Sequence, residues 1–181
     1  MQNHFILFGL DPCFDIDLKA LNARYRELAQ ASHPDRFIND SSEKQREAVQ
    51  RSALLNEAYK TLKNPVTRAE YLLSKIHLEP KGESFEMVHY HVTDAELLMQ
   101  QIEYREQLAE LHGTEEIEAL NRFQKETKSL IKTTTDQITE DFQSLNENSI
   151  TDLKNQICEL RFLEKLMQDA DELEEQMLEK L

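Results

Sequence analysis

The stretch that decides the fold reads Ser32-His33-Pro34-Asp35-Arg36-Phe37. Helix-forming residues with helical spacing stand on both sides of it. Proline has no backbone N–H to donate and disfavours helical geometry at the residue before it, so the first helix must end at His33. The chain therefore makes a tight, charged loop between two helices, and this loop carries an imidazole, a fixed backbone and a carboxylate. We interpret the loop as a contact point for another protein.

An amphipathic helix is predicted before the loop. Its apolar side chains recur at three- and four-residue steps from Leu18 to Leu28, which gives the helix one buried side. Asp15 or Asp17 is placed to cap its first turn. The helix is expected to run to about Ala31.

A second amphipathic helix is predicted after the loop. Ser42 and Gln45 have capping-box spacing at its start, and Asn64-Pro65 ends it. Its predicted buried side consists of Val49, Ala53, Asn56, Tyr59 and Leu62, with Leu55 and Ala58 beside them. Two such helices cannot bury both apolar faces alone, so short helices near Phe5 and after Pro65 are expected to cover the rest. This predicts a small helical domain at residues 1–76.

Residues 77–92 are predicted to be a linker, because Pro80 and Gly82 fall in a polar stretch there. His77, His89 and His91 also lie in it. No cysteine or carboxylate stands at ligand spacing from them, so we interpret the stretch as a solvated connector and expect no metal site.

Three long helices are predicted in residues 93–181. A capping box opens the first at Thr93, Gly113 ends it, Thr114 starts the second and Ser149 caps the third. Short connections between long helices favour an antiparallel three-helix bundle. The whole chain is therefore expected to be all-α.

The charge is distributed unevenly. Residues 1–76 hold 11 Lys and Arg against 10 Asp and Glu, a net of +1, whereas residues 77–181 hold 10 against 25, a net of −15. The total of −14 argues against nucleic acid or an anionic membrane surface as the main partner. The break in charge suggests two domains with different partners.

The remaining sequence features point to a cytoplasmic protein. No apolar run approaches the length of a membrane span, and no signal peptide is recognisable. Cys13 and Cys158 are far apart in the chain and form no CxxC pair, so free thiols in a reducing compartment are expected.

The bundle helices carry more apolar residues than one core stripe needs. The predicted core stripe of the first helix contains Leu97, Gln101, Tyr104, Leu108 and Leu111, and that of the last contains Leu153, Ile157, Leu160, Leu163, Met167, Leu173 and Met177. Leu98, Met99 and Ile102 point away from the first stripe, and Phe162 points away from the last. Leu98, Met99 and Ile102 could pack on the linker or the first domain. Alternatively, these three residues and Phe162 form a protein-docking patch with a rim of Glu103, Arg105 and Glu106.

The first domain resembles a J-domain. The resemblance is carried by His33-Pro34-Asp35 together with Tyr25-Arg26-Glu27-Leu28-Ala29 before the loop and Asn56-Glu57-Ala58-Tyr59-Lys60-Thr61-Leu62 after it. The tripeptide alone is weak evidence for a J-domain, but between these two helical segments it is specific evidence.

The similarity continues beyond a generic J-domain and resembles the HscB family of iron–sulfur co-chaperones over nearly the whole chain. It is carried by Phe5 to Leu10, Arg68 to Leu73, Leu98 to Glu106 and Leu160 to Leu166. The resemblance implies a J-domain, an antiparallel helical hairpin with flanking helices, joined to a C-terminal three-helix bundle. It implies two partners, an HscA-type heat-shock ATPase chaperone and an IscU-type iron–sulfur scaffold, and no cofactor.

The same resemblance implies roles for particular residues. The chaperone-binding residues, which would stimulate ATP hydrolysis, map to His33, Pro34, Asp35, Arg24, Arg26 and Arg36. The scaffold-binding residues map to Leu98, Met99, Ile102, Glu103, Arg105, Glu106 and Phe162.

Two other functions are alternatives to that of a co-chaperone. In an enzyme, His33 and Asp35 would act as an acid–base pair, but no nucleophile, metal set or glycine-rich turn stands nearby. We therefore do not expect an enzyme. A generic helical adaptor without ATPase-stimulating activity is the other alternative.

Overall fold

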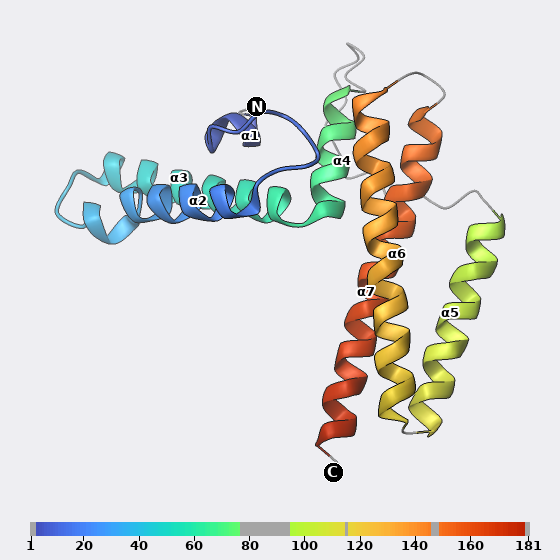
Figure 1. Cartoon of the computed structure of the whole chain (residues 1–181). Coiled ribbons are helices and arrows are strands. Elements are labelled where there is room, and N and C mark those ends of the chain that lie inside the picture. The colour runs from blue at the N-terminus through green and yellow to red at the C-terminus, as the bar shows by residue number, and fades with distance from the viewer. Residues whose placement is uncertain (1–2, 77–94, 115, 146–148, 180–181) are drawn as a thin grey trace. The chain divides into compact units, whose positions relative to one another are not determined.

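The computed structural model describes residues 3–76, 95–114, 116–145 and 149–179. Within these ranges every regular element is a helix, which confirms the all-α class (Figure 1). The chain divides into two compact units, residues 1–83 and 84–181. The predicted linker, its three histidines and the predicted cap at Thr93 lie outside the described residues.

The first unit is built on a pair of antiparallel helices, α2 (Leu18–Ala31) and α3 (Ser42–Lys63), which lie side by side (Figure 1). Between them lies a single turn of 3₁₀ helix, η1 (Pro34–Phe37). The short α1 (His4–Leu7) and α4 (Pro65–Ile76) complete the unit. Its core is formed by fully buried side chains from all four α-helices, among them Phe5, Leu21, Leu55, Leu62 and Leu73.

Side chains fix both ends of α2. Of the two candidate caps, Asp17 is the one used, since its Oδ1 accepts hydrogen bonds from the backbone N–H groups of Lys19 at 2.8 Å and Ala20 at 3.2 Å. At the other end, the Ser32 hydroxyl donates to the Leu28 carbonyl oxygen at 2.7 Å. This bond closes the last turn just before His33-Pro34.

The start of α3 differs from the prediction by one residue. Ser41, not Ser42, is the cap, and its Oγ accepts from the backbone N–H of Lys44 at 3.4 Å. Both serines have a hydroxyl that can cap the helix. Ser41 is the cap because its backbone is extended, as a capping residue requires. The Gln45 amide is then free to donate to the carbonyl oxygens of Ile38 at 2.9 Å and Asp40 at 3.0 Å. It therefore braces the loop before α3 instead of completing a capping box.

The predicted buried side of α3 is also displaced. The residues that are buried are Ala48, Leu55, Ala58 and Leu62, whereas Val49 is 54% exposed. The predicted stripe also included Asn56 and Tyr59, which lie at the edge of the buried side and serve as polar partners of α2. The Tyr25 hydroxyl donates to Asn56 Oδ1 and the Tyr59 hydroxyl to Asn22 Oδ1, both at 2.7 Å. The two tyrosine rings stack with centroids 4.0 Å apart, so this reciprocal pair ties α2 to α3.

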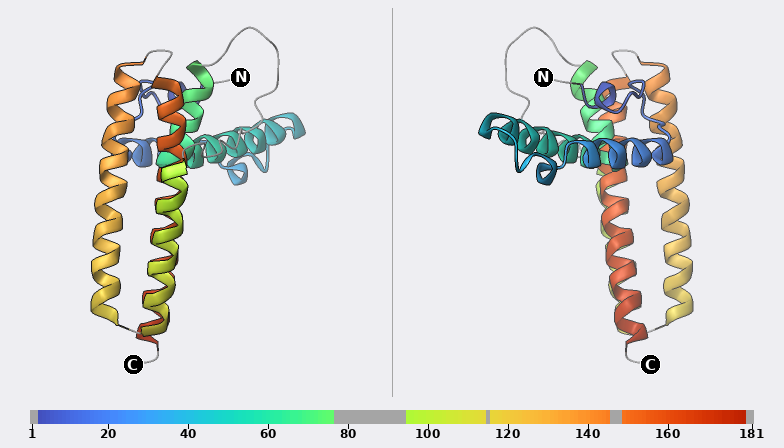
Figure 2. Two further views of the ribbon diagram at one scale, coloured as in Figure 1. Left: turned by 90° about the vertical axis from the view of Figure 1, so that its right-hand side faces the viewer. Right: turned by 90° about the vertical axis from the view of Figure 1, so that its left-hand side faces the viewer.

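The second unit consists of α5 (Ala95–Thr114), α6 (Ile117–Gln143) and α7 (Ser149–Leu178). Successive helices run in opposite directions alongside one another (Figure 2). All seven residues of the predicted core stripe on α7 are buried. The predicted stripe on α5 is also the side that faces the bundle, because its five residues are half-buried and every other described residue of that helix is exposed.

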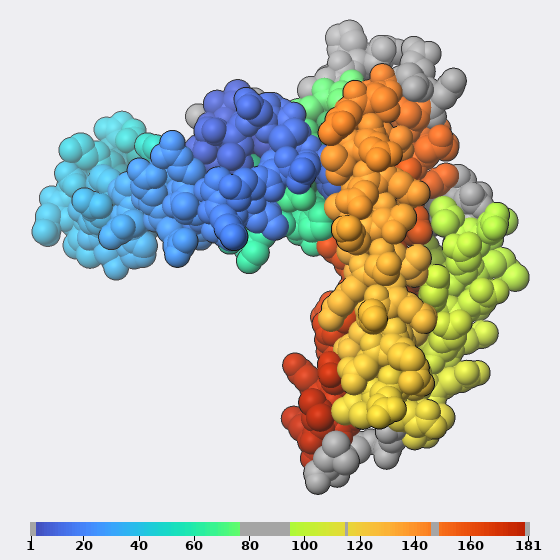
Figure 3. Space-filling view, viewed as in Figure 1, coloured from blue at the N-terminus to red at the C-terminus, as the bar shows by residue number. Residues whose placement is uncertain are grey.

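The helix α5 is attached less firmly than its two neighbours. No residue of α5 is buried, whereas ten of α7 are, among them Leu160 and Leu163. Tyr104, Leu108 and Leu111 are the α5 side chains that pack against the core of α6 and α7. Figure 3 shows that neither α6 nor α7 covers the outer side of α5 (yellow-green). Little apolar area therefore opposes local opening of this helix.

We expect the backbone amides of α5 to exchange with deuterium roughly ten- to a hundredfold faster than those in the middle of α7, because local opening of α5 exposes less apolar surface. Hydrogen exchange of the full chain, read by mass spectrometry, measures this difference. The C-terminal end of α7, where Leu178 is exposed, serves as an internal reference for fraying. Equal protection of α5 and the centre of α7 would contradict this reading of the packing.

Candidate functional site

The loop at residues 33–35 is exposed and ordered by its own hydrogen bonds. His33 caps η1, with Nδ1 accepting from the backbone N–H of Asp35 at 3.3 Å and its carbonyl oxygen accepting from the N–H of Arg36 at 3.0 Å. The same Nδ1 lies 3.5 Å from Asp35 Oδ2, while the two side chains remain 57% and 78% exposed. Pro34 occupies the first position of η1, where a missing N–H costs nothing. An imidazole and a carboxylate are thus presented to solvent in a fixed relation.

Contacts from both flanking helices hold this loop. Arg36 Nη1 donates to the Gln30 carbonyl oxygen of α2 at 3.4 Å. On the other side, the two hydrogen bonds from Gln45 fasten Ile38 and Asp40 to the start of α3. The loop is therefore supported at both ends, and the sequence pattern gave no sign of the support from Gln45.

The three predicted basic contacts do not form one cluster. Arg26 lies four residues before Gln30 and shares its side of α2, and Gln30 is the residue whose carbonyl oxygen accepts from Arg36. Arg24 is two residues away from Arg26, points to a different side, and forms an ion pair with Glu27 at 3.0 Å. The geometry groups Arg26 and Arg36 with the loop and separates Arg24 from it.

The predicted patch on α5 is exposed. Leu98, Met99 and Ile102 are 45%, 61% and 53% exposed, values that are high for large apolar side chains. The three rim residues, Glu103, Arg105 and Glu106, are exposed as well. An apolar centre with charged residues around it is the usual composition of a protein-binding surface.

Phe162 requires a correction. It was predicted to face away from the bundle core, but its ring is half-buried and packs against that core. The ring centroid lies 6.5 Å from that of Tyr104, and the guanidinium carbon of Arg105 lies 5.5 Å above the ring. The prediction gave the last helix of the bundle a single buried stripe, whereas α5 also packs against α7 beside that stripe. Phe162 therefore joins the patch at its inner edge, through Arg105.

A carboxyl group is partly buried next to this edge of the patch. Burial raises the pKa of Glu159 on α7, and a hydrogen bond with Thr134 of α6 lowers it in part. Burial also raises the pKa of Tyr104 on α5, with the charge of Glu159 adding to the effect. Glu159, three residues before Phe162, thus interacts with side chains of both other helices of the bundle.

We expect Glu159→Gln to stabilise the bundle at neutral pH, because the substitution removes a charge that burial disfavours. Because folding raises the pKa of Glu159, the carboxyl group contributes its full share to the stability of the bundle only below pH 4.5, its usual pKa. This stability is lost as the pH rises through the pKa of the folded state. Thermal unfolding followed by circular dichroism at pH 7 should give a midpoint roughly 1–3 °C higher. The gain should vanish at pH 4.

Asp136→Asn, which removes a carboxylate charge at an exposed position in the middle of α6, is the matched control and should change the midpoint little at either pH. A gain from Glu159→Gln that persists unchanged at pH 4 would mean that burial of the charge is not its cause.

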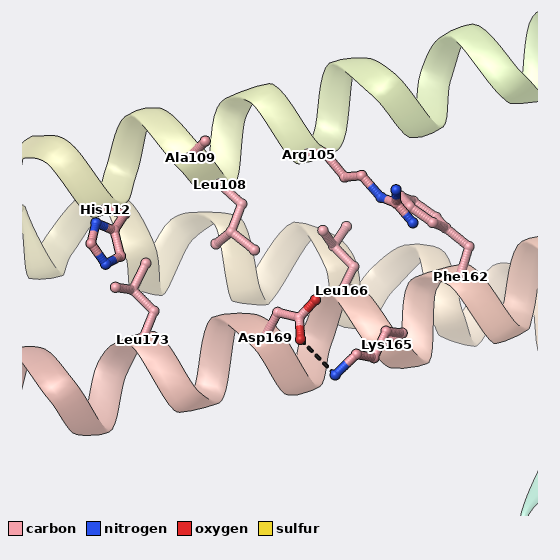
Figure 4. Close-up of a pocket in the computed structure, with 9 residues that line it drawn as sticks. All are labelled: Arg105, Leu108, Ala109, His112, Phe162, Lys165, Leu166, Asp169 and Leu173. Carbon is pink, nitrogen blue, oxygen red and sulfur yellow. Dashed lines mark ion pairs between the residues drawn. The ribbon is translucent and has the colours of Figure 1, made fainter.

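A groove of about 630 Å³ opens between α5 and α7 and begins at the same two residues, Arg105 and Phe162. Figure 4 shows the Arg105 guanidinium lying on the Phe162 ring at one end and His112 beside Leu173 at the other. Lys165 Nζ and Asp169 Oδ1 are 2.8 Å apart along its side. The other residues that line it are Leu108, Ala109 and Leu166.

This groove was not predicted from the sequence. Its residues recur at helical spacing, from Arg105 to His112 on α5 and from Phe162 to Asp169 on α7. In the sequence of either helix alone, these residues look like the edge of the apolar stripe that faces the core. Only the pairing of α5 with α7 identifies them as two sides of one groove.

Neither metal ligation nor membrane insertion is indicated by the described residues. Among them, no three His, Cys, Asp or Glu side chains gather closely enough to hold a metal ion. No helix in those same ranges is long and apolar enough to cross a bilayer. The two exposed surfaces, the loop at 33–35 and the patch on α5, are suited to contacts with other proteins.

Comparisons with known proteins agree with this division of the chain. A family model described as the DnaJ domain matches residues 5–71, and one described as the HSCB C-terminal oligomerisation domain matches residues 93–171. A protein of Vibrio vulnificus named "Co-chaperone protein HscB homolog" is 38% identical over 177 residues, covering 97% of this chain and 99% of the relative. One of Haemophilus influenzae with the same name is 37% identical over 179 residues, covering 99% of both.

Two solved structures are similar as well. The chaperone HscB from Vibrio cholerae has a TM-score of 0.83 and 32% identity, covering 97% of this chain and 99% of that one. Human co-chaperone protein HscB has a TM-score of 0.80 and 26% identity, covering 94% and 81%. With a J-domain, a C-terminal helical unit and relatives that match it from end to end, the chain belongs to the HscB family of J-domain co-chaperones.

Proposed function

We propose that this protein stimulates the ATPase of an HscA-type heat-shock chaperone and delivers an IscU-type scaffold to it for iron–sulfur cluster maturation. The observation that carries the proposal is the exposed, internally hydrogen-bonded turn at His33-Pro34-Asp35 in a chain of the HscB family. The protein contributes binding energy to both partners and needs no chemistry of its own.

The loop would act through differential binding. A protein that binds the hydrolysis-competent conformation of the ATPase more tightly than the resting conformation shifts the equilibrium toward the competent one. The size of the shift is set by the difference between the two binding free energies. About 1.4 kcal/mol changes the ratio tenfold, so a few contacts suffice. Because η1 holds His33 and Asp35, and Gln45 fastens the following residues Ile38 and Asp40, little side-chain and backbone freedom is lost on docking. Arg26 and Arg36 are placed to add charge contacts beside them.

The patch on α5 would bind the scaffold. Met99 and Ile102 are the kind of exposed apolar side chains that anchor an interface, and methionine adapts readily to a partner surface. Arg105 is already positioned by its contact with Phe162, so its guanidinium reaches the interface in a fixed orientation.

A steady-state ATPase assay of the HscA-type chaperone of the same organism tests the proposal, with this protein and the scaffold added separately and together. The proposed function requires that this protein alone accelerate hydrolysis and that the two together accelerate it further. A generic helical adaptor would bind one or both partners and leave the hydrolysis rate unchanged.

A further inference from the structure

The groove between α5 and α7 continues the patch without a break. Arg105 and Phe162 belong to both, and from them the groove extends toward the C-terminal end of α5, at His112. Its floor is apolar, because Leu166 and Leu173 of α7 are buried in the bundle core and Leu108 of α5 packs against that core. A partner seated on the patch therefore meets a second apolar surface next to it.

The charge of the groove differs from that of its surroundings. Residues 77–181 carry 25 acidic side chains against 10 Lys and Arg, yet the groove is lined by Arg105 and Lys165 and by a single carboxylate. That carboxylate, Asp169, is paired with Lys165 at 2.8 Å. In the part of the chain that the structure describes, no carboxylate forms an ion pair with Arg105, whose contact is the Phe162 ring at 5.5 Å. One fixed positive charge at the groove is thus left for a partner.

We propose that this groove receives a segment of the same scaffold, one that places an apolar side chain over Leu108 and Leu166 and a carboxylate against Arg105. The inference rests on the proposed function and extends it, since it adds a second contact to the patch and specifies its chemistry. An apolar floor excludes water from the contact, which strengthens the attraction between a guanidinium and a carboxylate.

Ala109 allows a clean test because it is exposed at the side of the groove and belongs to neither the patch nor the core. Ala109→Glu places a negative charge there, and Ala109→Lys places a positive one on a side chain of similar length. Both residues form helices well, so α5 should persist. Gln107→Glu adds the same negative charge on a different side of α5.

Titration calorimetry of each full-length variant with the IscU-type scaffold of the same organism measures the dissociation constant. We expect Ala109→Glu to weaken binding about fivefold, a change typical of a partly exposed charge contact. Ala109→Lys and Gln107→Glu should remain within about twofold of the unmodified protein. Circular dichroism checks that helix content is equal in all of them.

Met99→Ala, a change in the patch alone, separates the two proposals. If Met99→Ala weakens binding but Ala109→Glu does not, the groove is not part of the interface and the proposed function stands. Equal weakening by Ala109→Glu and Ala109→Lys would show that size, not charge, matters, and would overturn the carboxylate assignment. Absence of binding by the unmodified protein would overturn both.

Discussion

His33→Gln is expected to abolish stimulation of the chaperone's ATPase while leaving the fold intact. The imidazole is 57% exposed, so its removal creates no cavity in the core of the first unit. It does remove the ring nitrogen that accepts from the backbone N–H of Asp35 at 3.3 Å. Glutamine has a longer, freely rotating side chain, so the fixed relation between positions 33 and 35 is lost.

We expect the stimulated rate to fall by at least about tenfold, which corresponds to losing about 1.4 kcal/mol of differential binding. The measurement is steady-state ATP hydrolysis by the chaperone at saturating amounts of the variant. Asn39→Ala, at an exposed position in the same connection between α2 and α3, is the matched control and should stimulate normally. Full stimulation by His33→Gln would rule out the loop as the acting element.

The combined change Leu98→Ala, Met99→Ala and Phe162→Ala should weaken scaffold binding on the order of 100-fold. Three apolar anchors worth about 1 kcal/mol each give a loss of that size. Leu98 and Met99 are exposed and contribute little to the bundle. Phe162 contributes more, since its ring contacts Tyr104 and supports Arg105. Titration calorimetry with the scaffold measures the effect.

Because Phe162 is half-buried, the pair Leu98→Ala and Met99→Ala should be measured as well, and circular dichroism should show an unchanged bundle. The pair alone should weaken binding at least about tenfold. Ile6→Ala with Val49→Ala, which shortens two exposed apolar side chains of the first unit, is the control for nonspecific loss of apolar surface. If the double and the triple variant both bind the scaffold with wild-type affinity, the patch is not the scaffold-binding surface.

The parts of the fold that could be predicted are those set by local chemistry. Pro34 ends α2, Asp17 caps it, and the three- and four-residue apolar steps on α7 identify the buried side of that helix correctly. The J-domain was recognisable because its tripeptide stands between two patterned helices. Each of these features is fixed by residues within a few positions of one another.

The parts that could not be predicted depend on contacts between elements. Val49 was assigned to the buried side of α3 because apolar spacing alone does not distinguish it from Ala48, which α3 buries instead. The hydrogen bond between Tyr59 and Asn22 joins residues 37 positions apart. The packing of Phe162 against the bundle core and the groove were missed for the same reason, since the contact of α5 with α7 is invisible in either helix alone.

The central claim is that two separate surfaces of one chain bind two different proteins. The most direct test is a crossed comparison of His33→Gln and the triple patch variant in both assays. We expect His33→Gln to bind the scaffold with wild-type affinity and fail to stimulate the chaperone, and the patch variant to stimulate the chaperone normally and bind the scaffold weakly. If either variant loses both activities with its helix content unchanged, the two surfaces are not independent and the account is wrong.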